Sequence, residues 1–561
     1  MEWNPVRKSR SAYAGLIAAL FFGGPSAVRA QCPSYPYSFL TMSGASSFDQ
    51  FGASAASVGD VNGDGIPDLL VGAPFADPSG LSAAGQAVLL AGGIGTVLLT
   101  VNGAASGDLM GQAVAGSGDL NGDTVGDLLV GAPNADPAGL SAAGEVLAIS
   151  GATGGVLYSL AGTSPSDRFG QAVCVAGDVN ADGVPDLLVG APYASPLGLS
   201  MAGLARVFSG SSGAPIFPLP LIGSAVNQNF GYSVAGPGDV DGDGIADLFI
   251  GAPTSSQAKV FSGATGALLL TVSGMGYLGR SVAGPGDING DGTPDLLAGD
   301  AMTGGAAYSG VNGTVLFAVS GGVMAGPGDV TLDGVPDALV GRPAQGQAAV
   351  YSGLSGVQVA SFGTPPLGSG CPTTIGMAVA GAGDINSDGV VDMLVGEPYA
   401  NPAAGLDCAG QVKVWSFVAY PAGSTSFGAG CPGSNGASPA ISANGVPCLG
   451  SSVGISLSGA LSGTPAILIG GASSTSWLGG PLPLDLGPLG IPGCFLRVSV
   501  DALLPTTTTG PAGAGGASFW FTIPTSSTLL GQFAFFQWYV VDPGPFAIPG
   551  VTSPGLQVLL G

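Results

Sequence analysis

Histidine is absent from this 561-residue chain, and other residues that carry acid–base chemistry are scarce. Without histidine, the Ser-His-Asp and Cys-His nucleophilic arrangements are excluded, and so are the commonest zinc ligands. Only 11 residues are lysine or arginine, and no basic stripe is available to neutralise phosphates, so nucleic acid is not expected as a partner. Chemistry that needs only paired carboxylates, as in glycoside hydrolysis, stays open.

Residues that favour helices are also rare. Glutamate occurs only as Glu2, Glu145 and Glu397, and charged residues make up 8% of the chain. By contrast, there are 102 glycines and 44 prolines, and Val, Leu, Ile and Phe recur in short runs of strand length. This composition predicts an all-β protein with many tight turns.

The N-terminus has the pattern of a secretory signal peptide. Basic residues from Arg7 to Arg10 precede an apolar stretch, and small residues follow as far as Ala30. We therefore predict a signal peptide over residues 1–30 and export of the remainder, to the medium, the cell surface or the periplasm. No other stretch is long and apolar enough to cross a bilayer, so no transmembrane segment is expected in the mature chain. Seven cysteines in an exported chain suggest disulfides, with Cys431 and Cys448 as one possible pair.

Aspartate, in contrast, is abundant, and 22 of the 32 aspartates fall in seven loops of nine residues. The first loop reads Asp60-Val-Asn62-Gly-Asp64-Gly65-Ile66-Pro-Asp68. Side-chain oxygens at the first, third, fifth and ninth positions, with a backbone carbonyl at the seventh, suit Ca²⁺, which takes six to eight oxygens at about 2.3–2.6 Å. Glycine at the sixth position allows the sharp turn around an ion. The loops therefore predict up to seven structural Ca²⁺ ions.

The predicted calcium ligands occupy equivalent positions in all seven loops. They are Asp60, Asn62, Asp64, Ile66, Asp68; Asp119, Asn121, Asp123, Val125, Asp127; Asp178, Asn180, Asp182, Val184, Asp186; Asp239, Asp241, Asp243, Ile245, Asp247; Asp287, Asn289, Asp291, Thr293, Asp295; Asp329, Thr331, Asp333, Val335, Asp337; and Asp384, Asn386, Asp388, Val390, Asp392. The second loop has Thr124 instead of the turn glycine, and the sixth has Thr331 at the third position. Whether these two loops bind calcium stays open.

Each loop belongs to a unit of four strand-length segments, and the units recur every 42 to 61 residues, which is typical of β-propeller blades. Phe51-Gly52 precedes the first loop and Gly72-Ala73-Pro74 follows it, and most units repeat both motifs. These motifs resemble the FG-GAP repeats of integrin α-subunit propellers, in the form of an exported bacterial protein. The resemblance covers residues 35–420, and it implies a seven-bladed propeller that works in adhesion or recognition.

The strand inventory predicts how the ring closes. The seventh unit lacks a fourth strand after residues 411–415, whereas residues 37–43 look like the fourth strands of other units. We therefore expect residues 37–43 to complete the seventh blade of a propeller that spans residues 31–420. Residues 421–432 are predicted as a linker, and residues 433–561, with six or more short strands, as a small β-sandwich-like domain.

Four units share a long connection between their second and third strands, as in residues 75–85. In a closed ring these connections lie side by side on the face opposite the acidic loops. Aspartates in and beside them are candidate ligand-binding residues, namely Asp49, Asp77, Asp108, Asp136 and Asp167. The alternative is that these aspartates only fix turns.

The sequence thus predicts an exported, calcium-binding propeller that recognises an extracellular protein or glycan. No catalytic residue is assigned, and Ca²⁺ is the only cofactor expected. The alternative is a polysaccharide-active lyase or hydrolase on a propeller scaffold.

Overall fold

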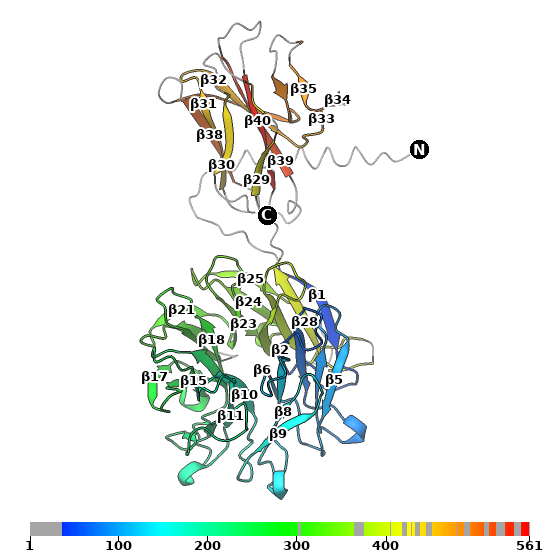
Figure 1. Cartoon of the computed structure of the whole chain (residues 1–561), viewed down its shortest axis with the longest axis vertical. Helices are drawn as coiled ribbons and strands as arrows, with labels where there is room; N and C mark the ends of the chain where they lie inside the picture. Colours follow the sequence, from blue (N-terminus) through cyan, green and yellow to red (C-terminus); the bar gives the residue numbers. More distant parts are fainter. Residues whose placement is uncertain are drawn as a thin grey trace. The chain divides into compact units, whose positions relative to one another are not determined.

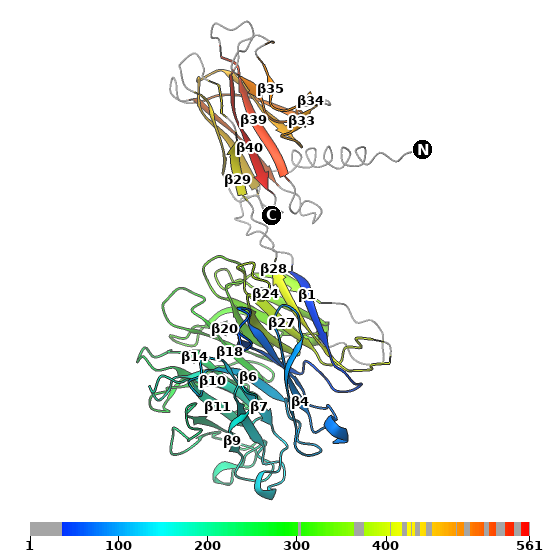
Figure 2. The ribbon, with the colours of Figure 1, turned by 45° about the vertical axis from the view of Figure 1, so that its right-hand side comes forward.

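A computed structural model gives the architecture of the chain (Figures 1 and 2). It describes residues 36–300, 304–363 and 375–417 except 404, and residues 423–559 with gaps at 428, 432–437, 445–451, 478–479, 487, 489–493, 510–514, 523–532 and 543–550. The predicted signal peptide over residues 1–30 lies outside the described residues. Contacts divide the chain into two compact units, one running from Tyr35 to Phe417 and the other containing Val418–Gly561.

The described residues of the first unit form seven four-stranded antiparallel sheets, and this part of the chain contains no α-helix. The first three sheets are β2 (Ser54–Gly59), β3 (Asp68–Ala73), β4 (Gln86–Leu90), β5 (Val97–Asn102); β6 (Ala113–Gly118), β7 (Asp127–Ala132), β8 (Glu145–Ile149), β9 (Val156–Ala161); and β10 (Ala172–Gly177), β11 (Asp186–Ala191), β12 (Leu204–Phe208), β13 (Leu221–Ile222). The next two are β14 (Val234–Gly238), β15 (Asp247–Ala252), β16 (Gln257–Phe261), β17 (Leu268–Ser273); and β18 (Ser281–Gly286), β19 (Asp295–Asp300), β20 (Gly304–Tyr308), β21 (Val315–Val319). The last two are β22 (Val323–Gly328), β23 (Asp337–Arg342), β24 (Gln347–Tyr351), β25 (Gln358–Phe362); and β26 (Ala378–Gly383), β27 (Asp392–Glu397), β28 (Gln411–Phe417), β1 (Pro36–Ser43). Single 3₁₀ turns follow five of the second strands: η1 (Pro78–Gly80), η2 (Pro137–Gly139), η3 (Pro196–Gly198), η4 (Pro253–Ser255) and η5 (Pro343–Gln345).

The seven sheets form a closed ring around their first strands, which gather at the centre (Figure 1). Each first strand contacts the first strands of the two neighbouring sheets, and β2 contacts both β6 and β26. The all-β prediction and the propeller are therefore confirmed. Each first strand consists largely of small residues because seven backbones converge there; a Cβ on Gly284 of β18, for example, would lie 2.5 Å from Cα of Pro237 in β14.

Close backbone packing explains the paired Gly motifs. A Cβ on Gly72, which precedes Ala-Pro after the first loop, would overlap the carbonyl oxygen of Gly111 in the next blade. The same contact joins Gly396 of the seventh blade to Gly52 of the first. Each FG turn therefore lies against the GAP glycine of the preceding blade, and this contact also spans the ring closure.

The N-terminal strand supplies the fourth strand of the last blade. Strand β1 pairs with β28 in antiparallel register from Pro36 opposite Phe417 to Ser43 opposite Gln411. Figure 2 shows the two strands side by side. Because β1 comes from the beginning of the propeller and β28 from its end, this pairing links the two ends of the ring and covers an edge that would otherwise be open.

The second unit is a β-sandwich with a shared apolar core. One sheet has the order β29 (Gly423–Phe427), β40 (Val551–Leu559), β39 (Phe533–Val540), β32 (Pro465–Gly471), β37 (Ala502–Thr507), and the other has β30 (Ala440–Asn444), β31 (Ser452–Ala460), β38 (Gly515–Thr522). Two short hairpins add β33 (Ser476–Trp477), β34 (Gly480–Pro481), β35 (Leu484–Asp485) and β36 (Phe495–Leu496). Ile455, Leu468 and Trp538 are completely buried between the sheets. Residues 423–427 were predicted as linker, but they form an edge strand on β40 because the sandwich offers that edge for pairing.

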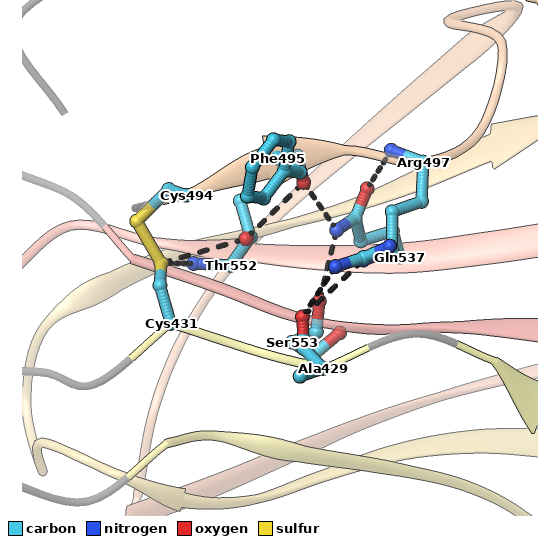
Figure 3. Close-up of a disulfide and its surroundings, with 8 residues drawn as sticks. All are labelled: Ala429, Cys431, Cys494, Phe495, Arg497, Gln537, Thr552 and Ser553. Atoms are coloured by element: carbon cyan, nitrogen blue, oxygen red, sulfur yellow. Dashed lines mark hydrogen bonds between the residues drawn. A yellow bond between two sulfur atoms is a disulfide. The ribbon is translucent and has the colours of Figure 1, made fainter. Parts of the chain in front are cut away.

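A disulfide joins Cys431 to Cys494, so the predicted pairing of Cys431 with Cys448 is wrong (Figure 3). Both cysteines are buried, at 2% and 1% exposure. Beside the disulfide, the amide nitrogen of Gln537 donates to the carbonyls of Phe495 and Ser553 at 2.9 and 2.8 Å. The disulfide and these bonds attach two segments to the large sheet. One contains Cys431, after β29, and the other contains β36.

Candidate functional site

Each acidic loop is closed by hydrogen bonds from its backbone to its own carboxylates. In the first loop, Oδ1 of Asp60 accepts the N–H groups of Gly63 and Asp64 at 2.7 and 3.1 Å, and its Oδ2 accepts that of Gly65 at 2.7 Å. Oδ1 of Asp64 accepts the N–H of Ile66 at 2.8 Å. These bonds hold the loop curled around its first aspartate, as a cation-binding loop requires.

The ninth-position aspartates are completely buried at the start of the second strands: Asp68, Asp127, Asp186, Asp247, Asp295, Asp337 and Asp392. In the third blade, Oδ2 of Asp186 accepts N–H groups of Val179 and Asn180 at 2.7 and 3.0 Å, and Oδ1 accepts that of Gly210 at 3.0 Å. Gly210 belongs to the turn between the third and fourth strands, so one carboxylate connects the loop to the outer hairpin of its blade.

Burial has an electrostatic cost at these positions. Desolvation raises the pKa of all seven ninth-position carboxyls, and it raises the pKa of Asp337 and Asp392 to about 6. An opposite charge beside a buried carboxylate favours its ionised form. A cation in each loop would therefore offset the penalty that the fold imposes.

Sequence reasoning missed a Ser-Gly pair that supports the loop from the third strand. The N–H of Gly151 donates to Asp127 at 3.0 Å, and a Cβ on Gly151 would overlap the carbonyl of Gly126. The hydroxyl of the preceding Ser150 donates to Asp123 at 3.5 Å, and equivalent serines reach the fifth-position aspartate at 3.2 Å in the sixth blade and 3.3 Å in the seventh. The available signal was the recurrence of Ser-Gly at residues 150–151, 209–210, 262–263, 309–310 and 352–353.

The donor set of the loops fits Ca²⁺, because carboxylate, amide and carbonyl oxygens are the hard ligands that this cation takes. In the fourth loop, ligand oxygens of Asp239, Asp241 and Asp247 lie within 4.8 Å of one another. This loop has aspartate at the third position, whereas the other loops have the neutral residues asparagine or threonine. Its additional carboxylate makes it the most acidic of the seven.

The two loops that depart from the pattern keep the same backbone course. Thr124 takes φ of 70° where other loops have glycine, and its N–H donates to Oδ2 of Asp119 at 2.7 Å. In the sixth loop, Thr331 donates its N–H to Asp337 at 2.9 Å, and Leu332 takes φ of 57°. Both loops can therefore curl as the others do. Thr124 and Leu332 are strained in this conformation, because positive φ is unfavourable for residues with a bulky side chain.

On the opposite face, long connections join the second and third strands of blades 7, 1, 2 and 3. We call the surface formed by residues 75–85, 134–144, 193–203 and 399–410 (404 excepted) the crescent. The loops before the first strands bond to it: Leu109 donates to the carbonyl of Ala83 at 3.3 Å, and Phe48 donates to that of Asp407 at 2.8 Å. The Phe48 contact crosses the ring closure, and Arg168 before the third blade donates to the carbonyl of Ala142 at 3.2 Å, so the contacts link all four blades.

Four of the five aspartates predicted as ligands accept a hydrogen bond from their own loop or connection. Oδ1 of Asp77 accepts the N–H of Ala83 at 2.7 Å, and Oδ1 of Asp136 accepts that of Ala142 at 2.6 Å. Asp49, Asp108 and Asp167 are buried. The carboxylates of Asp49 and Asp108 each accept an N–H from their own loop. The contacts favour the turn-fixing interpretation, although Asp77 and Asp136 are exposed.

Sequence reasoning missed three apolar side chains on this face. Phe48, Leu197 and Met201 are 62%, 87% and 40% exposed, and their φ angles are 69°, 53° and 46°. The residues at the place of Phe48 and Leu197 in the second blade are Gly107 and Ala138. These three side chains are open to solvent on the face that carries the crescent, so they are candidate contact residues.

Comparison with protein families accounts for the repeated units. Residues 51–90, 110–149 and 169–208 match the FG-GAP repeat, and residues 227–298 match the FG-GAP-like repeat. The chain contains FG-GAP repeats. The resemblance indicated by its FG and GAP motifs is therefore confirmed over these four units.

The chain is also similar to integrin α-subunits. It is 31% identical to integrin alpha-PS2 of Drosophila melanogaster over 229 residues, covering 36% of this chain and 15% of that protein. It is 32% identical to integrin alpha-V of Gallus gallus over 216 residues, covering 36% of this chain and 20% of that one. A third relative is phosphatidylinositol-glycan-specific phospholipase D of Bos taurus, 38% identical over 151 residues, covering 24% and 18%. The chain thus spans a fifth or less of the length of these relatives.

Among the described residues, no helix is long and apolar enough to cross a membrane.

Proposed function

We propose that this chain is an exported recognition module whose propeller is stabilised by Ca²⁺ and whose crescent binds an extracellular protein or glycan. The observation that carries the proposal is the recurrence, in all seven blades, of an acidic loop that buries its ninth carboxylate completely. The similarity to integrin α-subunits supports an adhesive role. The pattern of residues 1–30 supports export.

The role of Ca²⁺ in this proposal is structural. The residues that would hold the ion lie in one loop of each blade, and their buried member also bonds to the outer hairpin, as Asp186 does to Gly210. A bound ion would neutralise carboxylates that the fold has already desolvated. Extracellular calcium modules bind at about 10⁻⁴–10⁻³ M, so such sites stay filled in calcium-rich fluid and do not act as switches.

The crescent is the proposed ligand face because it combines exposed apolar anchors with acidic neighbours. Phe48 and Leu197 project from loops whose backbones are fixed by hydrogen bonds, and rigid anchors lose little entropy on binding. Asp77 and Asp136 lie on two other connections of the crescent, 75–85 and 134–144, and each keeps one carboxylate oxygen outside its loop bond. No described feature favours the polysaccharide-active alternative, and we do not propose it.

A printed array of glycans and peptides, probed with the full chain in calcium, tests this function. We expect capture that is lost in the double variant Phe48→Ser, Leu197→Ser and in excess chelator. Val156→Ser, which changes a 58% exposed residue at the start of β9, is the matched control and should bind as the wild type does. The proposal is contradicted if every captured ligand is still captured by the double variant, or if an arrayed glycan is turned over.

A further inference from the structure

The small sheet of the sandwich has two faces of opposite character. Its inner face carries Ile441, Ile455 and Phe521, which are 8%, 0% and 3% exposed and belong to the core. Because side chains alternate along a strand, the residues between them point outward. Antiparallel pairing places Ser442, Ser456 and Ser518 in one outward row across the three strands.

A tryptophan lies beside this row on the same face. Trp520 is opposite Gly454 in the register of β38 and β31, and it is 58% exposed, whereas its neighbour Phe521 is buried. A Cβ on Gly454 would lie 2.8–3.0 Å from atoms of the Trp520 indole, so the ring rests against the backbone of the central strand. Because Gly454 has no side chain, the indole can lie directly on the backbone of β31. Trp520 is nevertheless more than half exposed to solvent.

The sheet presents this ring without any charge. Strands β30, β31 and β38 contain no Asp, Glu, Lys or Arg. Ser442 and Ser518 are exposed, and their hydroxyls both donate and accept hydrogen bonds. A nucleic acid or an anionic membrane would need basic residues here, and a charged peptide would need a countercharge. The surface matches a partner that is uncharged, flat and rich in hydroxyl groups.

We propose that the outer face of the β30–β31–β38 sheet binds a neutral polysaccharide, with a sugar ring stacked on Trp520 and neighbouring sugar hydroxyls bonded to the serine row. An aromatic ring with few rotatable bonds provides a large, rigid contact at low entropic cost. Rows of outward residues recur about every 7 Å along the strands, which lets the contacts continue beyond one sugar. This site lies on the sandwich and does not depend on the ligand proposed for the crescent.

The test uses the full chain with soluble neutral glucan and mannan as probes and anionic polygalacturonate as comparison, in affinity electrophoresis and titration calorimetry. We expect binding to one neutral polysaccharide, unaffected by added salt because no charges pair. Trp520→Ala should weaken it by at least about tenfold, and Trp520→Phe by less. Leu503→Ala, which changes a 55% exposed residue on β37 of the other sheet, should not change it.

A second variant covers the case in which Trp520→Ala disturbs the fold. Ser518→Glu keeps the ring and places a bulky charge in the serine row, so it should also abolish binding while the melting temperature stays unchanged. The proposal is overturned if the wild type binds neither glucan nor mannan. It is also overturned if the wild type and both variants bind equally well. A dimer in the ultracentrifuge that Trp520→Ala disrupts, without any glycan binding, would assign this face to a second copy of the chain.

Discussion

The propeller and the sandwich solve the problem of cross-linking a Gly-rich β-structure in different ways. Each propeller blade ties its strands together through an acidic loop with a buried carboxylate, as at Asp186. The sandwich has only four charged residues after residue 433, which are Asp485, Arg497, Asp501 and Asp542, and it holds its segments with the buried disulfide between Cys431 and Cys494. If the loops bind Ca²⁺ as we propose, the first solution depends on a cation in the surrounding fluid, whereas the second is covalent and does not.

This difference has a physical origin in the number of units. A repeated ring can distribute its cross-links, because the same short loop recurs in every blade and requires only local residues. The sandwich is a single small domain in which segments far apart in sequence must meet, and a covalent bond between residues separated by 63 positions restricts its unfolded chain strongly. The comparison therefore predicts that the two units respond to different perturbations.

Removal of calcium should have the largest effect, and only on the propeller. Sites of millimolar to submillimolar affinity in about 2 mM calcium each contribute roughly 1 kcal/mol by mass action, so seven sites together contribute several kcal/mol. Scanning calorimetry with calcium and with excess chelator measures the shift. We expect one transition to fall by many degrees and the other to stay in place; two unmoved transitions would refute structural calcium.

Loss of the disulfide should have the reverse pattern. Replacing both Cys431 and Cys494 with serine removes a cross-link over 63 residues, for which the chain-entropy relation gives about 4 kcal/mol. The same calorimetric experiment should then show a lower sandwich transition and an unchanged propeller transition that still responds to chelator. A shift of both transitions would show that the two units unfold together.

The strained second loop offers a smaller and stabilising change within the propeller. Thr124→Gly relieves a β-branched residue at φ of 70°, and we expect the free energy of unfolding to rise by about 0.5–1 kcal/mol in calcium. Gly65→Thr, the reciprocal change in the first loop at φ of 86°, is the matched control and should destabilise by a similar amount. Denaturant titration measures both. A destabilised Thr124→Gly variant would mean that the threonine side chain contributes to the site.

The smallest predicted effect depends on pH. Burial raises the pKa of Asp167 from 3.8 to about 6. Because the folded-state pKa is the higher one, the stability contributed by this carboxyl is present below pH 3.8 and is lost as the pH rises through 6. The free energy of unfolding of Asp167→Asn should therefore exceed that of the wild type by about 1 kcal/mol or less at pH 7, and the two should be equal at pH 4. Equal gains at both pH values would contradict this origin.

The sequence predicted the propeller well because its signals are local and repeated. The nine-residue loops and the FG and GAP motifs each lie within a few residues, and strands such as Asp68–Ala73 are apolar after their first residue. Because the seventh unit lacks a fourth strand, the sequence predicts that residues 37–43 supply it, and the structure pairs these residues with β28. The acidic loop recurs seven times and most units repeat the FG and GAP motifs, which reduces the ambiguity of any single copy.

The candidate contact residues were less accessible from the sequence. Aspartates such as Asp49 and Asp108 were chosen for their charge, but the fold buries them and uses them as hydrogen-bond acceptors for their own loops. Phe48 and Leu197 gave no signal, because nothing in a sequence separates an exposed apolar residue from a buried one when the loop has no periodicity. The residues 423–427 were predicted as linker since they are polar, and only the edge of β40 makes them a strand.

The sequence by itself determined the all-β class, the repeat, the positions of the acidic loops and the chemistry of the cation that suits them. Those properties follow from residue type and from the spacing between nearby residues, and neither depends on which distant segments come into contact. Tertiary structure alone decided which carboxylates are desolvated, which cysteine pairs with Cys431, and that Trp520 lies open upon Gly454. These features depend on which distant segments become neighbours, and burial and pairing exist only after the sheets have assembled.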